Sequence, residues 1–258
     1  MTGTTFAVER DAERGIARIT IGASGQLNIL THANRFELAE AIEALGAEPP
    51  MRVLVIASAS ERAFSAGVDI SEFMGLTPLE MSRLYESMSV PARIPQPVIA
   101  AIDGHCYGGP FELCLACDFR IVTDRCRLGL PEISLGQMPG SGGGQRLLRL
   151  AGVTRAKLMC MTGLKIDGKT AESWGIASRC VPPEELSTAV EELAAQLAGL
   201  APRAVQMMKL SLNAGADAPL STALELECKM YATLRTTEDY VEGLASWQEK
   251  RPPNFRGR

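Results

Sequence analysis

Two glutamates stand where a carboxylate could reach a reactive centre. Glu112 comes directly after the turn residues Gly108, Gly109 and Pro110, and Glu132 follows twenty positions later, in a second glycine-rich stretch. A positioned carboxyl group can take a proton from water or give one to carbon, so two of them together could run acid–base chemistry. Glu112 could instead be a simple charge partner of a helix N-terminus. The residues alone leave open whether the two glutamates share a site.

The turn before Glu112 also offers a backbone hydrogen-bond donor. Pro110 is expected at the first position of a helix, where its missing N–H costs nothing, and the preceding N–H of Gly109 then has no partner in the helix. The helix dipole adds to the pull of that N–H on a polarised oxygen. Val68, which follows the glycine turn at Gly67, could supply a second donor. Two converging donors would form an oxyanion hole, whereas the alternative is two plain strand-to-helix turns.

The elements that must position these residues alternate between strands and helices. Short runs rich in apolar and β-branched residues predict strands at 5–9, 16–21, 52–58, 97–102 and 118–124. Apolar residues recur at helical spacing in three sets, which are Leu38, Ile42 and Leu45, then Leu186, Val190, Leu193 and Leu197, then Leu220, Leu224, Cys228 and Tyr231. Thr77, Pro78 and Glu80 predict a capped helix start.

Strands nearly vanish from the predicted pattern after Gly140. This order of elements predicts an α/β fold with an α/β body over residues 1–200 and a helical region over residues 201–258. The first of these would hold the catalytic site and the second would mediate oligomerisation.

Composition narrows the functional classes. The 258-residue chain has a net charge of −4, and its most amphipathic helical stretches are acidic, so a nucleic-acid partner is not expected. No stretch is apolar for long enough to span a membrane, and no membrane partner is expected. Seven scattered cysteines and no secretory signal at the N-terminus predict reduced thiols and a cytoplasmic location. Cys114 and Cys117 form a CxxC in an apolar stretch without a neighbouring histidine, so we expect core thiols and no metal site.

Three blocks of the sequence, AFSAGVDI, AIDGHCYGGPFELCLACD and LGLPEISLGQMPGSGGGQRL, together resemble the crotonase (enoyl-CoA hydratase/isomerase) superfamily in order and spacing. The C-terminal stretch TTEDYVEGLASWQEKRPPNFRGR is similar to the end of members of that family. The resemblance implies a spiral of ββα turns followed by a helical trimerisation region, and hence a homotrimer or a dimer of trimers. It also implies an acyl-CoA substrate, with coenzyme A as part of the substrate and no separate cofactor.

The resemblance assigns roles to individual residues. It implies that the N–H groups of Val68 and Gly109 form the oxyanion hole. It implies a coenzyme A site made of Ala66, Val68, Asp69 and Ile70, through backbone contacts near the adenine, and of Trp247 and Lys250 from the C-terminal stretch. The chain departs from the common family pattern at Pro110, Val68, Ser71, Asp103 and His105.

The pair of glutamates selects among the reactions of the family. Both positions that a hydratase fills with glutamate are filled here, so the resemblance implies an enoyl-CoA hydratase in which Glu112 activates water and Glu132 protonates Cα. Double-bond isomerisation, which often needs only the second glutamate, and thioester hydrolysis remain alternatives. One branch of the family binds RNA through a lysine-rich helix, and the acidic helices of this chain disfavour that function.

Overall fold

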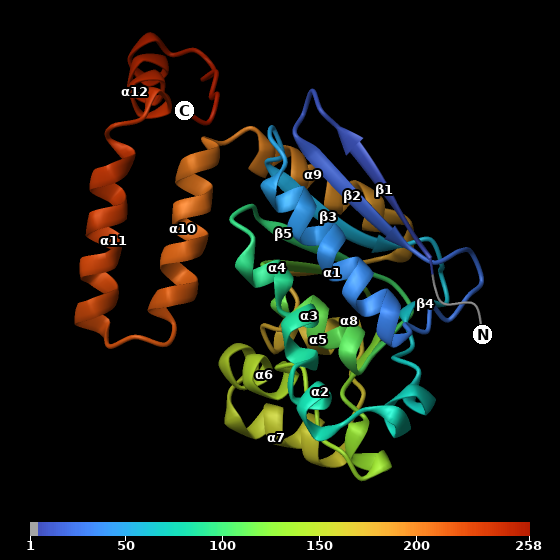
Figure 1. Cartoon of the computed structure of the whole chain (residues 1–258). Helices are drawn as coiled ribbons and strands as arrows, with labels where there is room; N and C mark the ends of the chain where they lie inside the picture. Colours follow the sequence, from blue (N-terminus) through green and yellow to red (C-terminus); the bar gives the residue numbers. More distant parts are fainter. Residues whose placement is uncertain (1–4) are drawn as a thin grey trace.

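The chain folds into an α/β body with three C-terminal helices that extend to one side of it (Figure 1). This computed structural model describes residues 5–258. The larger sheet has the strand order β1-β2-β3-β5-β7-β9, and only β1 runs antiparallel to its neighbour. Its strands are β1 (Phe6–Asp11), β2 (Ile16–Ile21), β3 (Val53–Ser58), β5 (Val98–Ile102), β7 (Phe119–Thr123) and β9 (Arg179–Val181).

A second, smaller sheet gives the fold its spiral character. It consists of three parallel strands in the order β4-β6-β8, which are β4 (Ala63–Ser65), β6 (His105–Tyr107) and β8 (Arg127–Gly129). Each of them directly follows a strand of the larger sheet, since β4 follows β3, β6 follows β5 and β8 follows β7. Each of three successive turns of the chain therefore contributes one strand to each sheet. Because the small sheet is parallel, the residues that follow its strands lie together at one end of it.

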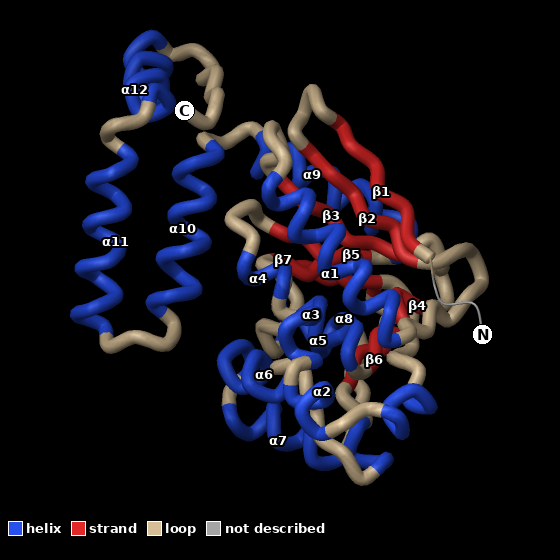
Figure 2. The backbone as a smooth tube through the Cα atoms, in the orientation of Figure 1, coloured by secondary structure: helices blue, strands red, loops and turns tan. Residues whose placement is uncertain are grey.

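Helices cover both faces of the larger sheet (Figure 2). On one face, α9 (Leu186–Ala198) packs its small residues, including Ala194, against Val53, Val55 and Ile99. On the other face lies the main core, to which α1 (His32–Ala47) contributes Leu38, Ile42 and Leu45, and α5 (Gly109–Ala116) is buried over its whole length. The central strands β3 and β5 are therefore buried almost continuously rather than at every second residue, as expected for a parallel sheet with an apolar layer on each face.

The remaining helices of the body are short. The segment between β4 and β5 contains the 3-10 helix η1 (Ile70–Gly75) and the helices α2 (Pro78–Ser82), α3 (Leu84–Met88) and α4 (Val90–Arg93). The predicted cap is confirmed, because Thr77 and Glu80 form a capping box at α2. Further along the chain come η2 (Glu132–Leu135), α6 (Gly143–Ala151), α7 (Val153–Thr162), α8 (Gly168–Ser173) and η3 (Pro183–Glu185).

The C-terminal helices are α10 (Pro202–Gly215), α11 (Leu220–Leu234) and α12 (Glu238–Glu249). One buried lysine ties α10 to the body. The ammonium group of Lys209 donates to the carbonyl oxygens of Pro91 and Gln96 and to Asp118, at 2.7, 2.8 and 2.7 Å. By contrast, α11 has no buried residue. None of the described helices is long and apolar enough to cross a membrane.

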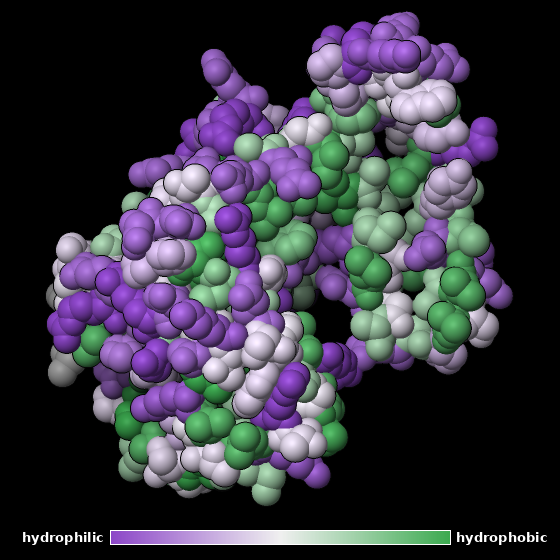
Figure 3. Space-filling model, turned by 180° about the vertical axis from the view of Figure 1, so that it is seen from behind, coloured by the Kyte–Doolittle hydropathy of each residue, from purple (hydrophilic) through white to green (hydrophobic). Residues whose placement is uncertain are grey.

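The surface between the body and the helical region is hollowed and largely apolar, as the rear view shows (Figure 3). A cavity of about 790 Å³ lies there, lined from the body by Leu115 and from α10 by Met208 and Leu212. Large apolar side chains are also exposed further along the region, and Leu220 is 75% exposed. Residues 202–249 thus present apolar surface that the same chain does not cover.

Candidate active site

One pocket of the body, with a volume of about 170 Å³, collects most of the predicted site residues. It lies where the small sheet ends and the segment carrying η1, α2 and α3 passes over it. Its lining includes six of the residues predicted from the sequence, which are Ala66, Val68, Ile70, Gly109, Glu112 and Glu132. The rest of the wall is mainly apolar, with Phe73, Met81, Leu84, Leu135 and Met138.

The two predicted backbone donors lie side by side. The backbone around Val68 is held by hydrogen bonds from the N–H of Leu30 to the oxygen of Gly67, at 3.0 Å, and from the N–H of Asp69 to the oxygen of Leu30, at 2.8 Å. The next β–α turn starts α5 at Gly109, and a Cβ atom on that glycine would lie 3.1 Å from Cγ1 of Val68. Within residues 5–258, neither the N–H of Val68 nor that of Gly109 has a hydrogen-bond partner.

The start of α5 differs slightly from the sequence expectation. Pro110 occupies the second helical position, because the helix begins at Gly109 rather than at the proline. The consequence for hydrogen bonding is the same, since the N–H groups of the whole first turn lack intrahelical acceptors. Gly108 caps the helix with a φ of 60°, a conformation that favours glycine.

Glu112 is buried, with 2% of its surface exposed, and points from the first turn of α5 into the pocket. Its Oε1 accepts hydrogen bonds from the backbone N–H groups of Ser141 and Gly143, both at 2.8 Å. Burial raises the pKa of Glu112, against the opposing effects of these two bonds and of the nearby Arg35 and Arg146. Gly143 permits the approach, because a Cβ there would lie 2.7 Å from Cγ of Glu112.

Glu132 begins η2 on the opposite side of the turn at Gly108. Burial raises the pKa of Glu132 to about 7, and the charge of Glu112 contributes to the same shift. Its Oε2 is buried and has no hydrogen-bond partner among the described residues. Two carboxyl groups of raised pKa therefore share one pocket, and one of them carries an oxygen that is available to a reacting group.

Two of the four residues predicted for the adenine end of coenzyme A use their N–H groups elsewhere. The N–H of Ala66 donates to Leu27 at 2.8 Å, and that of Asp69 donates to Leu30. The Asp69 side chain caps η1 and accepts from the N–H and the hydroxyl of Ser71. A ligand would have to use the carbonyl oxygens of Ala66 and Asp69, and Asp69 does not line the pocket.

The structure does not bring Trp247 and Lys250 to this pocket. Trp247 lies on α12 with 79% of its surface exposed, and Lys250 ends that helix in the left-handed conformation. In Figure 1, α12 lies at the far end of the helical region from α2 and α3, which cover the pocket. Contact between these two residues and coenzyme A stays a prediction.

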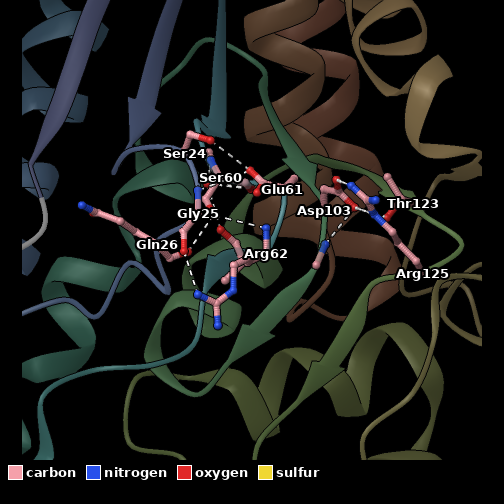
Figure 4. A network of polar contacts seen from close by, with 12 residues as sticks. Ser24, Gly25, Gln26, Ser60, Glu61, Arg62, Asp103, Thr123 and Arg125 are labelled. Carbon is pink, nitrogen blue, oxygen red and sulfur yellow. Dashed lines mark hydrogen bonds and ion pairs between the residues drawn. The ribbon is translucent and has the colours of Figure 1, made fainter.

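The departures from the family pattern at Asp103 and His105 lie outside the pocket lining. Asp103 forms an ion pair with Arg125 and accepts from the hydroxyl of Thr123 at 2.6 Å, as Figure 4 shows beside a separate network around Glu61. His105 is exposed, and its Nδ1 lies 3.0 Å from the hydroxyl of Tyr107. Both side chains therefore have structural partners.

Sequence reasoning missed Arg35, which is buried in α1 and lines the pocket. The signal was available, because Arg35 precedes Leu38 by three residues and Ile42 by seven and so lies on the apolar face that they define. The backbone donors of Ser141 and Gly143 were also missed. Only the fold brings their loop to Glu112.

The comparison with known families shows which family the chain belongs to. The family model described as enoyl-CoA hydratase/isomerase matches residues 11–258. The chain belongs to the enoyl-CoA hydratase/isomerase family. A protein named a probable enoyl-CoA hydratase of Mycobacterium bovis is 35% identical over the full length of both chains. A crotonyl-CoA hydratase of Syntrophomonas wolfei is 32% identical, over 95% of this chain and 96% of its own.

Solved structures of enoyl-CoA hydratase/isomerase relatives confirm the predicted fold class. The crystal structure of an enoyl-CoA hydratase from Bacillus anthracis superposes with a TM-score of 0.91 at 36% identity, covering 98% of this chain and 99% of that one. One from Geobacillus kaustophilus superposes with a TM-score of 0.92 at 34% identity, covering 99% of both chains. The predicted crotonase-like spiral with a helical C-terminal region is thus correct.

Proposed function

We propose that this protein is an enoyl-CoA hydratase, which adds water reversibly across the double bond of an α,β-unsaturated acyl-CoA thioester. One observation carries the proposal. Two carboxyl groups of raised pKa, Glu112 and Glu132, line the same pocket as two backbone N–H groups without partners, those of Val68 and Gly109. The names of the relatives support the same activity.

In the proposed reaction, the thioester oxygen accepts from the N–H groups of Val68 and Gly109. Glu112 takes a proton from water as the water oxygen bonds to Cβ, and the electrons of the double bond move toward the thioester to give an enolate. The two donors stabilise this negative oxygen, and losing one such donor typically costs about 10²–10³ in rate. Glu132 then gives its proton to Cα, which completes the 3-hydroxyacyl thioester.

The pocket supports this division of protons. Glu112 accepts two backbone hydrogen bonds and lies near two guanidinium groups, an environment that favours its ionised form relative to Glu132. Glu132 has an unpartnered oxygen and a pKa of about 7, so a large share of it carries a proton near neutral pH. We therefore assign the proton of the reactive pair to Glu132 and the ionised form to Glu112.

Coenzyme A is part of the proposed substrate and stays attached through the thioester, so the reaction needs no separate cofactor. Isomerisation of a double bond is the nearest alternative within the family, and it would need only Glu132. The direct hydrogen bonds that hold Glu112 in the pocket favour a reaction that uses both carboxylates. Incubation with crotonyl-CoA separates the alternatives, since hydrolysis releases free coenzyme A, whereas hydration and isomerisation keep the thioester and only hydration adds the mass of one water to it.

We also propose that the chain assembles as a homotrimer or a dimer of trimers through residues 201–258. The supporting observation is the uncovered apolar surface of α11, where Leu220, Leu224 and Tyr231 are all exposed. Light scattering at micromolar concentration should give three or six times the mass of one chain. A monomer mass would contradict the assembly, and Leu224→Lys should shift the mass toward the monomer while Glu225→Lys, on the same helix, should not.

A further inference from the structure

Arg35 is a buried cation in the wall of the proposed acyl-CoA pocket. It lies on α1, on the same face as the core residues Leu38 and Ile42, and only 2% of its surface is exposed. A buried charge is retained at a large cost unless it is paired, so an arginine at this position needs a partner. The charge of Arg35 favours the ionised form of Glu112, but no step of the proposed chemistry uses its hydrogen-bond donors.

The guanidinium group of Arg35 is only partly satisfied by the protein. Its Nη2 donates to the carbonyl oxygen of Leu84 at 3.1 Å and to the hydroxyl of Ser141 at 3.0 Å. Its Nε is buried without a partner, and Nη1 makes no hydrogen bond to any described residue. Two of its three nitrogens thus remain without an acceptor in a side chain that lines the pocket. This is the donor pattern that an anionic ligand would complete.

The second guanidinium near Glu112 shows the contrast. Arg146 donates from Nη1 to the oxygen of Ser141 at 3.0 Å and from Nη2 to the hydroxyl of Ser89 at 2.9 Å, and it does not line the pocket. Together Arg35 and Arg146 bring two positive charges to a site whose carboxyl pair, in its reactive state, carries one negative charge. One positive charge is therefore left unbalanced, and an anionic ligand would neutralise it.

Ser141 limits the distance between Arg35 and Glu112. Its N–H donates to Glu112 at 2.8 Å and its hydroxyl accepts from Arg35 at 3.0 Å. Because one serine residue links the two groups, the guanidinium lies within about 10 Å of the Glu112 carboxylate. Water activated by Glu112 attacks Cβ, so only a few further carbon atoms fit between Cβ and a group bound by Arg35.

We propose that Arg35 binds a carboxylate at the far end of the acyl group, and that the preferred substrates are short 2-enoyl-CoA thioesters with a terminal carboxylate. The inference rests on the proposed function, since it places such a substrate in the same pocket. Arg35 is then a specificity-determining residue that pairs its free donors with the substrate. The five-carbon and six-carbon dicarboxylic thioesters are short enough to fall within this limit.

Binding of saturated thioesters tests the inference without turnover. Glutaryl-CoA and pentanoyl-CoA have five acyl carbons each and differ in the terminal carboxylate. In isothermal titration calorimetry, the wild-type protein should bind glutaryl-CoA about 10- to 100-fold more tightly, as expected for hydrogen bonds to a charged group. Arg35→Met should remove this preference, and Arg35→Lys should restore part of it. Arg146→Met should change both affinities by the same factor.

Each other outcome overturns the inference. Equal wild-type affinity for the two thioesters would show that the pocket does not select a carboxylate, and it needs no variant, so it holds even if Arg35→Met fails to fold. Equal weakening of both ligands by Arg35→Met would make Arg35 a positioning residue for Ser141. Failure of both thioesters to bind the wild-type protein would contradict the acyl-CoA site itself, and so the proposed function as well.

Discussion

Gly108 and Glu132 approach so closely that a Cβ atom on Gly108 would lie 3.2 Å from Oε1 of Glu132. The same glycine adopts a φ of 60° as it leads into α5. The turn that leaves the N–H of Gly109 without an intrahelical partner therefore also makes room for the carboxyl group of Glu132. Donor and acid are brought together by one residue that must lack a side chain.

Replacing Gly108 by alanine should lower both stability and activity. The left-handed backbone should cost about 1–2 kcal/mol of unfolding free energy, and the added methyl group should displace the Glu132 carboxyl and reduce kcat about tenfold or more. Gly152→Ala is the matched control, because Gly152 has a φ of 79° and a Cβ there would meet nothing within 4 Å. Equal kcat losses in the two variants would show that the loss does not come from the contact between residue 108 and the carboxyl group of Glu132.

The pH dependence of kcat/KM should follow the proton shared by Glu112 and Glu132. The reactive pair holds one proton in both directions of the reaction, so hydration and dehydration should decline together as that proton is lost. The pKa of Glu132 is about 7, which places the decline above about pH 7, approaching tenfold per pH unit. A rate that stays flat to pH 9 in both directions would contradict this assignment.

Glu132→Gln should make the protein more stable at alkaline pH. The folded pKa of Glu132 is raised above its ordinary value of 4.5, so folding favours the neutral form and is penalised once the group ionises. The penalty is absent below about pH 4.5 and grows as pH rises to about 7, reaching about 1–3 kcal/mol. Thermal melts should show a higher Tm for the variant at pH 8 and no difference at pH 4. A lower Tm at pH 8 would contradict the sign.

Glu112→Gln should abolish most of the hydration activity without disturbing the fold. The amide oxygen can still accept from the N–H groups of Ser141 and Gly143, so the fold and thioester binding should survive. The amide cannot take a proton from water, and hydration should fall by about 10²–10⁴. Glu112→Ala should lose stability in addition, because it leaves those two buried donors unpaired.

Proton exchange at Cα of a saturated acyl-CoA, followed by mass spectrometry in deuterated water, refines the division of roles. Exchange needs Glu132 and the two backbone donors, so Glu112→Gln should retain it. If that variant loses exchange as completely as hydration while its fold is intact, the assignment of separate roles to Glu112 and Glu132 is wrong.

The sequence predicted the body well where patterns were long. The strand at Ile16–Ile21 and the buried helix face of Leu38, Ile42 and Leu45 are confirmed. The first strand extends to Asp11 rather than ending at residue 9, because its pairing continues until Asp11 meets Ile16. The small sheet was missed because its strands are only three residues long, too short for a period to show.

The residues of the site were predicted from sequence motifs, but the distances between them could not be. Local rules identified the free N–H of Gly109, whereas its contact with Val68 depends on two spiral turns lying side by side. Arg35 was missed because only the apolar residues of its helix face were used in the prediction, although its spacing from Leu38 and Ile42 places it on the same face. The hydrogen bonds to Glu112 come from a loop about thirty residues away, which no local pattern places.

The central claim is tested most directly by incubating the wild-type protein and Glu132→Gln with crotonyl-CoA in ¹⁸O-labelled water and identifying the products by mass spectrometry. The account predicts that the wild-type product gains one labelled water and keeps its thioester, with the label on the β-hydroxyl. Glu132→Gln should form less than about a tenth of it in the same time, while still binding the thioester. An isomer without label, or a labelled free acid with free coenzyme A, would contradict hydration. Wild-type rates in Glu132→Gln would remove Glu132 from the mechanism.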